Sequence, residues 1–372
     1  MEFAFAGACE YETLAGSRTE LYAFPRPPGA AALPGGRRTE SAYKMTPQFK
    51  HWLEKAQVQA AAAAALAFMW FVGWRLVQPE DPQAALTFIP TGHYTCFAVF
   101  AALVLAFAAG CALVTLPARP EGALLATLVG AAGLSLRSAP MRTLLWQFPD
   151  PRWVFLKLAV EALLMVAVLI GAAVVILLVR GVFRRLAPRW VWKERPEQLP
   201  GGAEKAGDQG RASDPSEPAA TLRAGAARAG ACLLMEMAAA TVLLVLTFRS
   251  PDRGQIAFAL AGSFFLSALI AHQTFPARTV AACWLGPVIM AVAVFALGYL
   301  VANYSDQPTW HAALMVAQRL PLRAALPVDW MTLGGAGAVG GFWLSRRFHY
   351  ARLHHGQENQ KATSEGKLKT ES

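Results

Sequence analysis

Three charged side chains lie inside long apolar stretches of this chain, and they are the first candidates for chemistry. Lys157 and Glu161 are four residues apart in the stretch Trp153–Arg185, and Glu236 lies in the stretch Ala229–Phe248. A lone charge in the middle of a membrane-spanning helix costs about 2.5–3.5 kcal/mol on insertion scales, so such groups usually face a bundle interior or a water-filled cavity. A polar path for transport is the function that this placement favours.

A purely structural role for the same three residues stays open. Residues four apart lie on one face of a helix, so Lys157 and Glu161 can neutralise each other. The long Lys157 side chain can also reach the headgroups, and Glu236 can lie protonated and hydrogen-bonded between helices. We expect Glu161 to line a polar path with Lys157 as its outer neighbour, and together with Glu236 they form the candidate intramembrane polar site.

The short motifs of soluble enzymes are missing or misplaced. Residues 335–340 satisfy GxGxxG, but they lie inside an apolar stretch, without the strand and the acidic residue that a dinucleotide site needs. We interpret Gly337 and Gly341, at GxxxG spacing, as helix-packing positions. HExxH, GxSxG and GxxxxGK[ST] do not occur, and the His and Cys residues lack the spacing of metal ligands. No catalytic residue, metal site or cofactor is predicted, and an enzyme would need a site that these motifs do not reveal.

The elements that hold the charged residues are apolar helices. Residues 162–179 contain no charged side chain, and eighteen residues of helix span roughly 27 Å at about 1.5 Å per residue. That length is close to the ~30 Å hydrocarbon core of a bilayer, in which a helix satisfies its own backbone groups. We expect eight spans, at Val58–Val77, Thr95–Leu116, Gly122–Ser138, Trp153–Arg185, Ala229–Phe248, Gly254–His272, Val280–Val301 and Trp330–Ser345. The last is near the lower length limit for crossing.

Composition points to the same class of protein. The 372 residues are 55% hydrophobic and 16% charged, whereas soluble chains carry about 25% charged residues. The net charge of +10 arises mostly from basic residues beside the apolar stretches, which fits membrane anchoring rather than nucleic-acid binding. The predicted fold class is an all-α, polytopic integral membrane protein whose partners are the lipid bilayer and other membrane proteins.

The basic clusters orient the spans. Arg180, Arg184 and Arg185 follow the uncharged part (162–179) of the fourth span, and Arg346 and Arg347 follow the last span. The positive-inside rule therefore places the central linker and both termini in the cytoplasm of a cell with an inner or plasma membrane. The predicted divisions are a polar N-terminal segment with an amphipathic lead-in (1–56), two four-helix halves (57–180 and 229–345), a disordered linker (181–228) and a basic tail (346–372).

The two halves share a short motif. Thr115–Arg119 (TLPAR) ends the second span, and Thr274–Arg278 (TFPAR) ends the sixth. Four spans per half would give both halves the same orientation, which predicts a parallel repeat. The alternative is that Pro and Arg mark the inner ends of two unrelated helices. Residues 1–44 show no apolar periodicity, so Met45 is expected to begin the functional chain.

The sequence is compatible with two classes of function. The two-halved layout and the intramembrane charges favour a transporter or permease of unknown substrate. The missing motifs and the small-residue faces favour a non-catalytic scaffold or a subunit of a larger membrane complex. Gly286-Pro287 predicts a kink in the seventh span, because proline removes a backbone hydrogen bond and clashes with the preceding turn.

Overall fold

The computed structural model describes residues 47–79, 81, 84–148, 151–187, 191, 217–277, 279–302 and 321–349. Residues 1–46 form a separate unit that lies outside this described part, and every described residue belongs to the second unit, Pro47–Ser372. The predicted start at Met45, most of the predicted linker and most of the predicted basic tail also fall outside the described residues.

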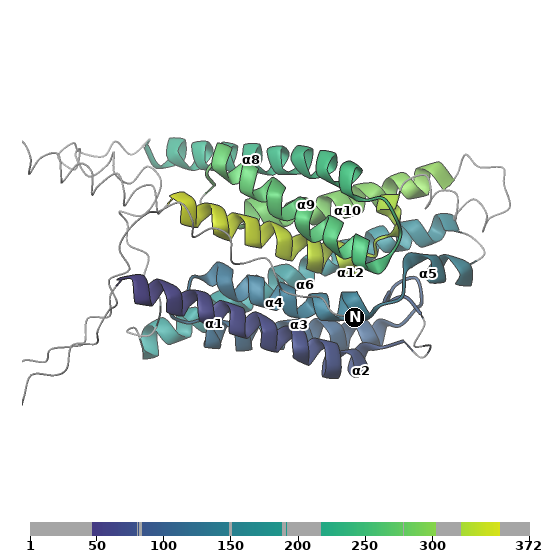
Figure 1. The fold of residues 1–372 in the computed structure, drawn as a ribbon, viewed down its shortest axis with the longest axis horizontal. Helices are drawn as coiled ribbons and strands as arrows, with labels where there is room; N and C mark the ends of the chain where they lie inside the picture. The colour runs from purple at the N-terminus through teal and green to yellow at the C-terminus, as the bar shows by residue number, and fades with distance from the viewer. Residues whose placement is uncertain are drawn as a thin grey trace, which may run out of the picture. The chain divides into compact units, whose positions relative to one another are not determined.

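The described chain is helical, and no strand occurs in it. Its elements can be followed in order in Figure 1. They are α1 (Pro47–Phe68), the π-helix η1 (Met69–Gly73), α2 (Trp74–Val77), α3 (Tyr94–Val114), α4 (Pro120–Arg137), α5 (Met141–Gln147), α6 (Pro151–Leu186), α8 (Glu217–Thr247), α9 (Arg253–Thr274), α10 (Ala281–Ala302), the 3₁₀-helix η3 (Pro321–Ala324), α12 (Pro327–Asp329) and the π-helix η4 (Trp330–Gly334), with residues 335–349 also helical. We call the continuous helical stretch 327–349 the C-terminal helix.

Six helices are long and apolar enough to cross a membrane. They are Trp52–Val77, Tyr94–Val114, Arg152–Leu186, Gly225–Thr247, Arg253–Thr274 and Ala281–Val301. This confirms an all-helical chain with several candidate spans. The other two ranges predicted as spans are helical as well, in α4 and the C-terminal helix. These two helices are not both long enough and apolar enough to count as candidate membrane spans. The number of eight spans therefore stays a prediction.

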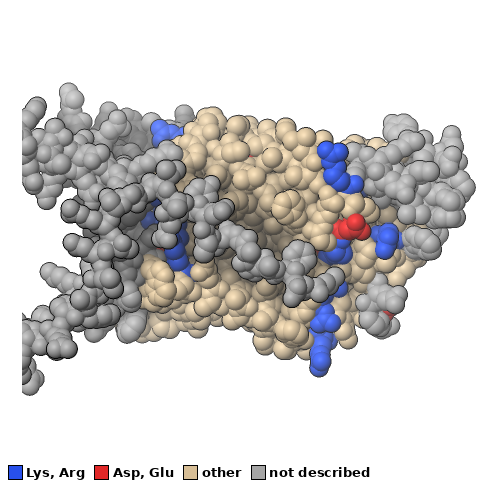
Figure 2. All heavy atoms as spheres, in the orientation of Figure 1, with Lys and Arg blue, Asp and Glu red and all other residues tan. Residues whose placement is uncertain are grey.

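The surface between the ends of these helices is apolar. Figure 2 shows the described Lys, Arg, Asp and Glu side chains of one face gathered toward two ends, with none in the tan surface between them. Large apolar side chains are exposed along that region, including Leu163, Val174 and Leu177 of α6 and Leu234 and Val245 of α8. A soluble monomer rarely exposes so much contiguous apolar area. The surface is consistent with a multi-pass membrane protein.

α4 and the C-terminal helix, which are not among the six candidate membrane spans, are the helices most enclosed by protein. In α4 thirteen residues are buried, from Glu121 to Ser135, and residues 327–335 of the C-terminal helix are all buried. The C-terminal helix packs on α4, α9 and α10 through η4, while α1 covers α4. Because neighbouring helices shield α4 and the C-terminal helix, small and polar residues can replace the large apolar ones that a lipid-facing helix needs.

Glycines allow the C-terminal helix to touch α9 through the backbone. A Cβ atom added at Gly337 would lie 2.3 Å from the carbonyl oxygen of Ala261, and one at Gly341 would lie 2.1 Å from that of Phe265. No side chain fits at either distance, so both positions need glycine. The structure thus places Gly337 and Gly341 at a close helix–helix contact.

The two halves are packed differently. In the first half α1 packs mainly on α4, whereas in the second half α8 packs mainly on α9, and α6 and α10 join the two halves. The predicted parallel repeat is therefore not confirmed. The helical part of α8 also begins at Glu217, inside the range predicted to be linker, because the alanine-rich stretch that starts there favours a helix.

Candidate functional site

Glu161 lies in α6 and holds the loop between α2 and α3. The side chain is fully buried, and its Oε2 accepts hydrogen bonds from the backbone N–H groups of Phe88 (2.9 Å) and Ile89 (3.0 Å). The loop residues 84–88 are themselves buried, so the loop folds into the bundle at this end. Hydrogen bonds from backbone N–H groups to a carboxylate are among the stronger ones in proteins. Glu161 therefore anchors a loop.

The predicted neighbour of Glu161 does not pair with it. Lys157 is exposed, and its Nζ lies 6.0 Å from the centre of the Phe148 ring. No ion pair joins Lys157 and Glu161, both of which lie in the described part of the chain. The loop backbone supplies two donors to Oε2 of Glu161, while Oε1 has no hydrogen-bond partner among the described residues, so the Lys157 ammonium does not neutralise this carboxyl group.

A buried ion pair lies at the same end of the bundle, which we call the outer end after its predicted side. Arg253 of α9 binds Asp329 of α12 through two hydrogen bonds, Nη1 to Oδ2 (2.7 Å) and Nη2 to Oδ1 (2.9 Å). Asp329 also accepts from Ser135 Oγ (2.6 Å) and from the backbone N–H of Leu326 (2.8 Å), and Arg253 donates to the Ser135 carbonyl. The cluster ties α4, α9 and the C-terminal helix together.

Of this cluster, sequence patterns could indicate Asp329 but not its pairing with Arg253. An acidic residue just after a proline at the start of an apolar run marks a helix N-terminus, so Asp329 carries a recognisable signal. Its bond to the Leu326 N–H is half of a capping box. The partner Arg253 lies 76 residues away and no local pattern links the two.

Glu236 is held much more weakly than Glu161 or Asp329. It lies in α8, it is fully buried, and within the described residues neither Oε1 nor Oε2 makes a hydrogen bond of regular geometry, while the Cys283 thiol is a weak partner beside the carboxyl group. It lies eleven residues from each end of the candidate span Gly225–Thr247. An ionised carboxylate in such a place is strongly unfavourable, so the neutral, protonated form is favoured while the site is closed.

Helix α10 forms the wall opposite Glu236. A Cβ atom at Gly286 would lie 3.2 Å from Glu236 Oε1, so the missing side chain gives the carboxyl group its space. Pro287 lies inside α10 and has no N–H, which deprives the Cys283 carbonyl of its usual helical donor. Of the two predicted kink residues, Gly286 therefore faces the intramembrane carboxylate, whereas the Pro287 ring faces Gly334 of the C-terminal helix.

Two thiols complete the surroundings of Glu236. Cys232 lies one turn before Glu236 on α8, and its Sγ is 3.9 Å from that of Cys283 on α10. Both cysteines are fully buried. Gly286 is only five residues from the start of the candidate span at Ala281, so the group lies nearer the end of the bundle that holds the α9–α10 turn. We call that end the inner end after its predicted side.

The inner end carries its own polar contacts. Arg346 pairs with Glu121 (2.6 Å) between the C-terminal helix and α4, and His272 Nδ1 lies 2.7 Å from Ser345 Oγ. Burial lowers the pKa of Arg347 to about 10, and the charge of Glu54 opposes part of this shift. These contacts join helix ends near the two turns of the TLPAR and TFPAR motifs.

The two motif turns are capped in similar ways. The carbonyl of Ala118 accepts a hydrogen bond from Arg180 Nη2 (2.5 Å), and that of Ala277 lies 3.1 Å from His272 Nε2. Arg180 also donates to the carbonyls of Thr115 and Leu116. A basic side chain thus stabilises each turn, from α6 in one half and from α9 in the other.

The described residues contain no cluster of three or more His, Cys, Asp or Glu side chains that could hold a metal ion. Comparisons of the chain with known protein families, with characterised proteins and with solved structures find no match. The class of protein therefore follows from the chain itself: an all-helical chain with six apolar helices long enough to cross a membrane.

Proposed function

We propose that the protein is a proton-coupled membrane permease in which Glu236 carries the proton. The observation that supports this proposal is a fully buried carboxyl group, deep within a candidate membrane span, that no charged group or backbone N–H of the described residues holds and that has only the Cys283 thiol beside it as a weak partner. A group that serves only to hold helices together would be expected to have stronger partners, as Glu161 and Asp329 do. Intramembrane carboxyl groups of this kind are typical of proton relays in pumps and transporters.

The surroundings of Glu236 fit a group that binds and releases a proton. Gly286 leaves room for the carboxyl group, and Pro287, the next residue of the continuous helix α10, cannot donate a helical hydrogen bond. Interrupted helices that expose backbone carbonyls line the ion sites of many secondary transporters. Movement of α10 against α8 about Pro287 would let water reach Glu236 from the inner end, where the proton would leave.

The outer end would stay closed in this arrangement. The Arg253–Asp329 pair joins α9 to the C-terminal helix and, through Ser135, to α4. Glu161 holds the loop 84–89 into the bundle at the same end. Both features support an arrangement that opens first toward the inner end.

Carbodiimide labelling tests this proposal. Dicyclohexylcarbodiimide crosses membranes and reacts with protonated carboxyl groups in apolar surroundings, forming a stable N-acylurea. We expect Glu236 to be labelled in membrane vesicles, and we expect the labelling to fall as the pH rises, because a carboxyl group that exchanges its proton with water loses the reactive form. Glu236→Gln should abolish the labelling, whereas Glu161→Gln should leave it unchanged.

The second candidate function is a membrane scaffold or a subunit of a larger complex. The loop-anchoring role of Glu161 and the tight contact at Gly337 and Gly341 favour it. A scaffold has no need to open Glu236 to water. Labelling of Glu236 that stays constant as the pH rises, or no labelling at all, would support the scaffold and contradict the permease.

A further inference from the structure

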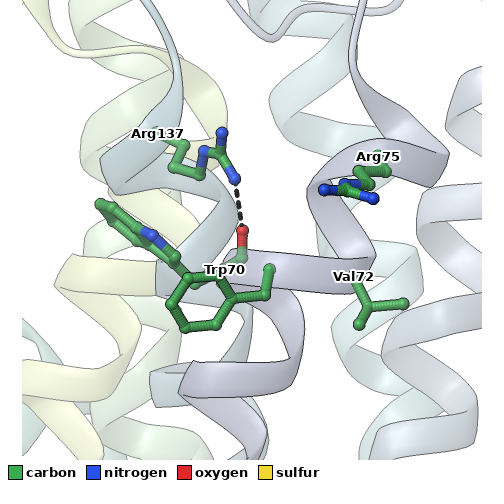
Figure 3. A pocket seen from close by; sticks show the side chains of 5 residues that line it. Trp70, Val72, Arg75 and Arg137 are labelled. Atoms are coloured by element: carbon green, nitrogen blue, oxygen red, sulfur yellow. Dashed lines mark hydrogen bonds between the residues drawn. The ribbon is translucent and has the colours of Figure 1, made fainter.

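A pocket of about 610 Å³ lies at the outer end of the first candidate span, away from the residues considered above. Trp70, Phe71, Val72, Arg75 and Arg137 line it. Figure 3 shows the guanidinium groups of Arg75 and Arg137 pointing toward one another across the pocket, with the Trp70 side chain beneath Arg137. Two positive charges and an aromatic ring therefore converge on one space.

The π-helix η1 sets the position of Arg137. The N–H of Trp74 bonds to the carbonyl of Met69 rather than to that of Trp70, as an α-helix would require. Arg137 Nη1 instead donates to the Trp70 carbonyl (2.8 Å), and its Cζ lies 5.8 Å and 5.4 Å from the ring centres of Trp70 and Trp74. Arg137 is thus held at the pocket by one hydrogen bond and by two cation–π contacts.

Arg75 faces the pocket without a protein partner. It is exposed, and within the described residues its guanidinium makes no hydrogen bond or ion pair. No carboxylate lines the pocket. Two arginines that face one space without an acidic residue leave a local excess of positive charge, and guanidinium groups match the geometry of phosphate oxygens.

The apolar residues of the pocket indicate where the phosphate comes from. Phe71 and Val72 are 66% and 44% exposed, on the same helix that carries Arg75. Arg75 lies two residues before the end of the candidate span Trp52–Val77, which is the depth of the headgroups. A ligand here would meet charge at the headgroup level and apolar side chains next to it, toward the hydrocarbon.

We propose that this pocket binds one anionic phospholipid, with the phosphate between Arg75 and Arg137 and an acyl chain along Phe71 and Val72. The planar guanidinium group donates two parallel hydrogen bonds to phosphate oxygens, and this geometry serves a lipid headgroup in either leaflet. Unlike phosphatidylcholine, phosphatidylglycerol keeps a net negative charge, so both arginines favour it. The proposal does not depend on Glu236, which lies in α8.

Native mass spectrometry of the purified full chain in a neutral detergent tests the proposal. We expect phosphatidylglycerol to bind about tenfold more tightly than phosphatidylcholine with the same acyl chains, because the choline ammonium of phosphatidylcholine brings a positive charge close to the two arginines. Arg75→Gln should remove most of this preference. This variant should fold normally, because the Arg75 guanidinium makes no contact that the fold needs. Arg142→Gln, which alters an exposed arginine outside the pocket, should bind both lipids as the unaltered chain does.

Three results would overturn the proposal. Equal binding of the two lipids would show that the pocket does not select charge. An unchanged preference in Arg75→Gln would place the lipid elsewhere. Inorganic phosphate that binds as tightly as phosphatidylglycerol, and that also depends on Arg75, would make the site one for a soluble anion rather than for a lipid.

Discussion

The buried pair of Arg253 and Asp329 gives the strongest stability prediction. Asp329→Asn removes the negative charge beside a guanidinium whose side chain is 19% exposed, while Arg253→Gln leaves a carboxylate that is 0% exposed. Removing one partner of a buried ion pair costs about 3–5 kcal/mol. We expect Asp329→Asn near the lower end of that range, because Arg253 can still reach water, and Arg253→Gln near the upper end.

A double-mutant cycle isolates the interaction itself. The free energy of unfolding is measured for both single variants and the double variant, by titration of detergent-solubilised protein with a denaturing detergent. We expect the double variant to lose at least about 1.5 kcal/mol less than the sum of the two single losses, which corresponds to a hydrogen bond between charged groups. Arg249→Gln alters an exposed arginine whose one hydrogen bond among the described residues goes to the carbonyl of Leu246, and this variant should be near neutral. Losses that add within about 0.5 kcal/mol would refute the pair as the link between these helices.

Three further predictions follow from the contacts described above. Glu161→Leu should destabilise the fold by about 2–3 kcal/mol and make the loop 84–89 sensitive to proteases, because two buried N–H groups lose their acceptor; an unchanged cleavage pattern would contradict this. Gly337→Ala should lower the free energy of unfolding by about 1–3 kcal/mol, because the added methyl group would push the C-terminal helix away from α9. The control Gly262→Ala, on an open face of α9, should be neutral or stabilising. Reporter enzymes fused after residues 205 and 360 should both give cytoplasmic signals, and an external signal at either would break the alternating path.

Hydropathy was enough to predict where the helices lie. All eight ranges predicted as spans are helical, because lipid leaves the backbone no other way to satisfy its polar groups. Hydropathy could not tell which helices face lipid. The ranges of α4 and the C-terminal helix were both predicted as spans, the last one near the lower length limit, and the structure encloses both helices in protein.

The candidate site was predictable only as separate residues. Glu161 and Glu236 stand out in sequence because a carboxylate in an apolar run is rare, but their surroundings differ completely. The partners of Glu161 are the backbone N–H groups of Phe88 and Ile89. Every residue type except proline carries this group, so no sequence pattern predicts these hydrogen bonds. The rule that residues four apart share a helix face suggested Lys157 instead, and it could not anticipate a loop that folds into the bundle.

The Arg253–Asp329 pair shows a second limit of sequence reasoning. Each residue lies at the predicted start of an apolar helix, where a charge is ordinary. Their pairing depends on how α9 and the C-terminal helix pack around α4. Sequence patterns of 3.6 or 7 residues describe one helix at a time, so a contact between distant helix ends stays invisible to them.

The reactivity of Cys283 toward a membrane-impermeant thiol reagent tests the proposed permease most directly. Cys283 and Glu236 line the same α8–α10 contact, so water that reaches one also reaches the other. The measurement uses sealed vesicles of both orientations and a variant in which Cys283 is the single cysteine, with Cys111, buried on α3, as the single cysteine of the control. We predict that Cys283 reacts from the inner side and that Cys111 does not. A Cys283 that reacts no faster than Cys111 from either side would contradict the account, because Glu236 would then have no path to water.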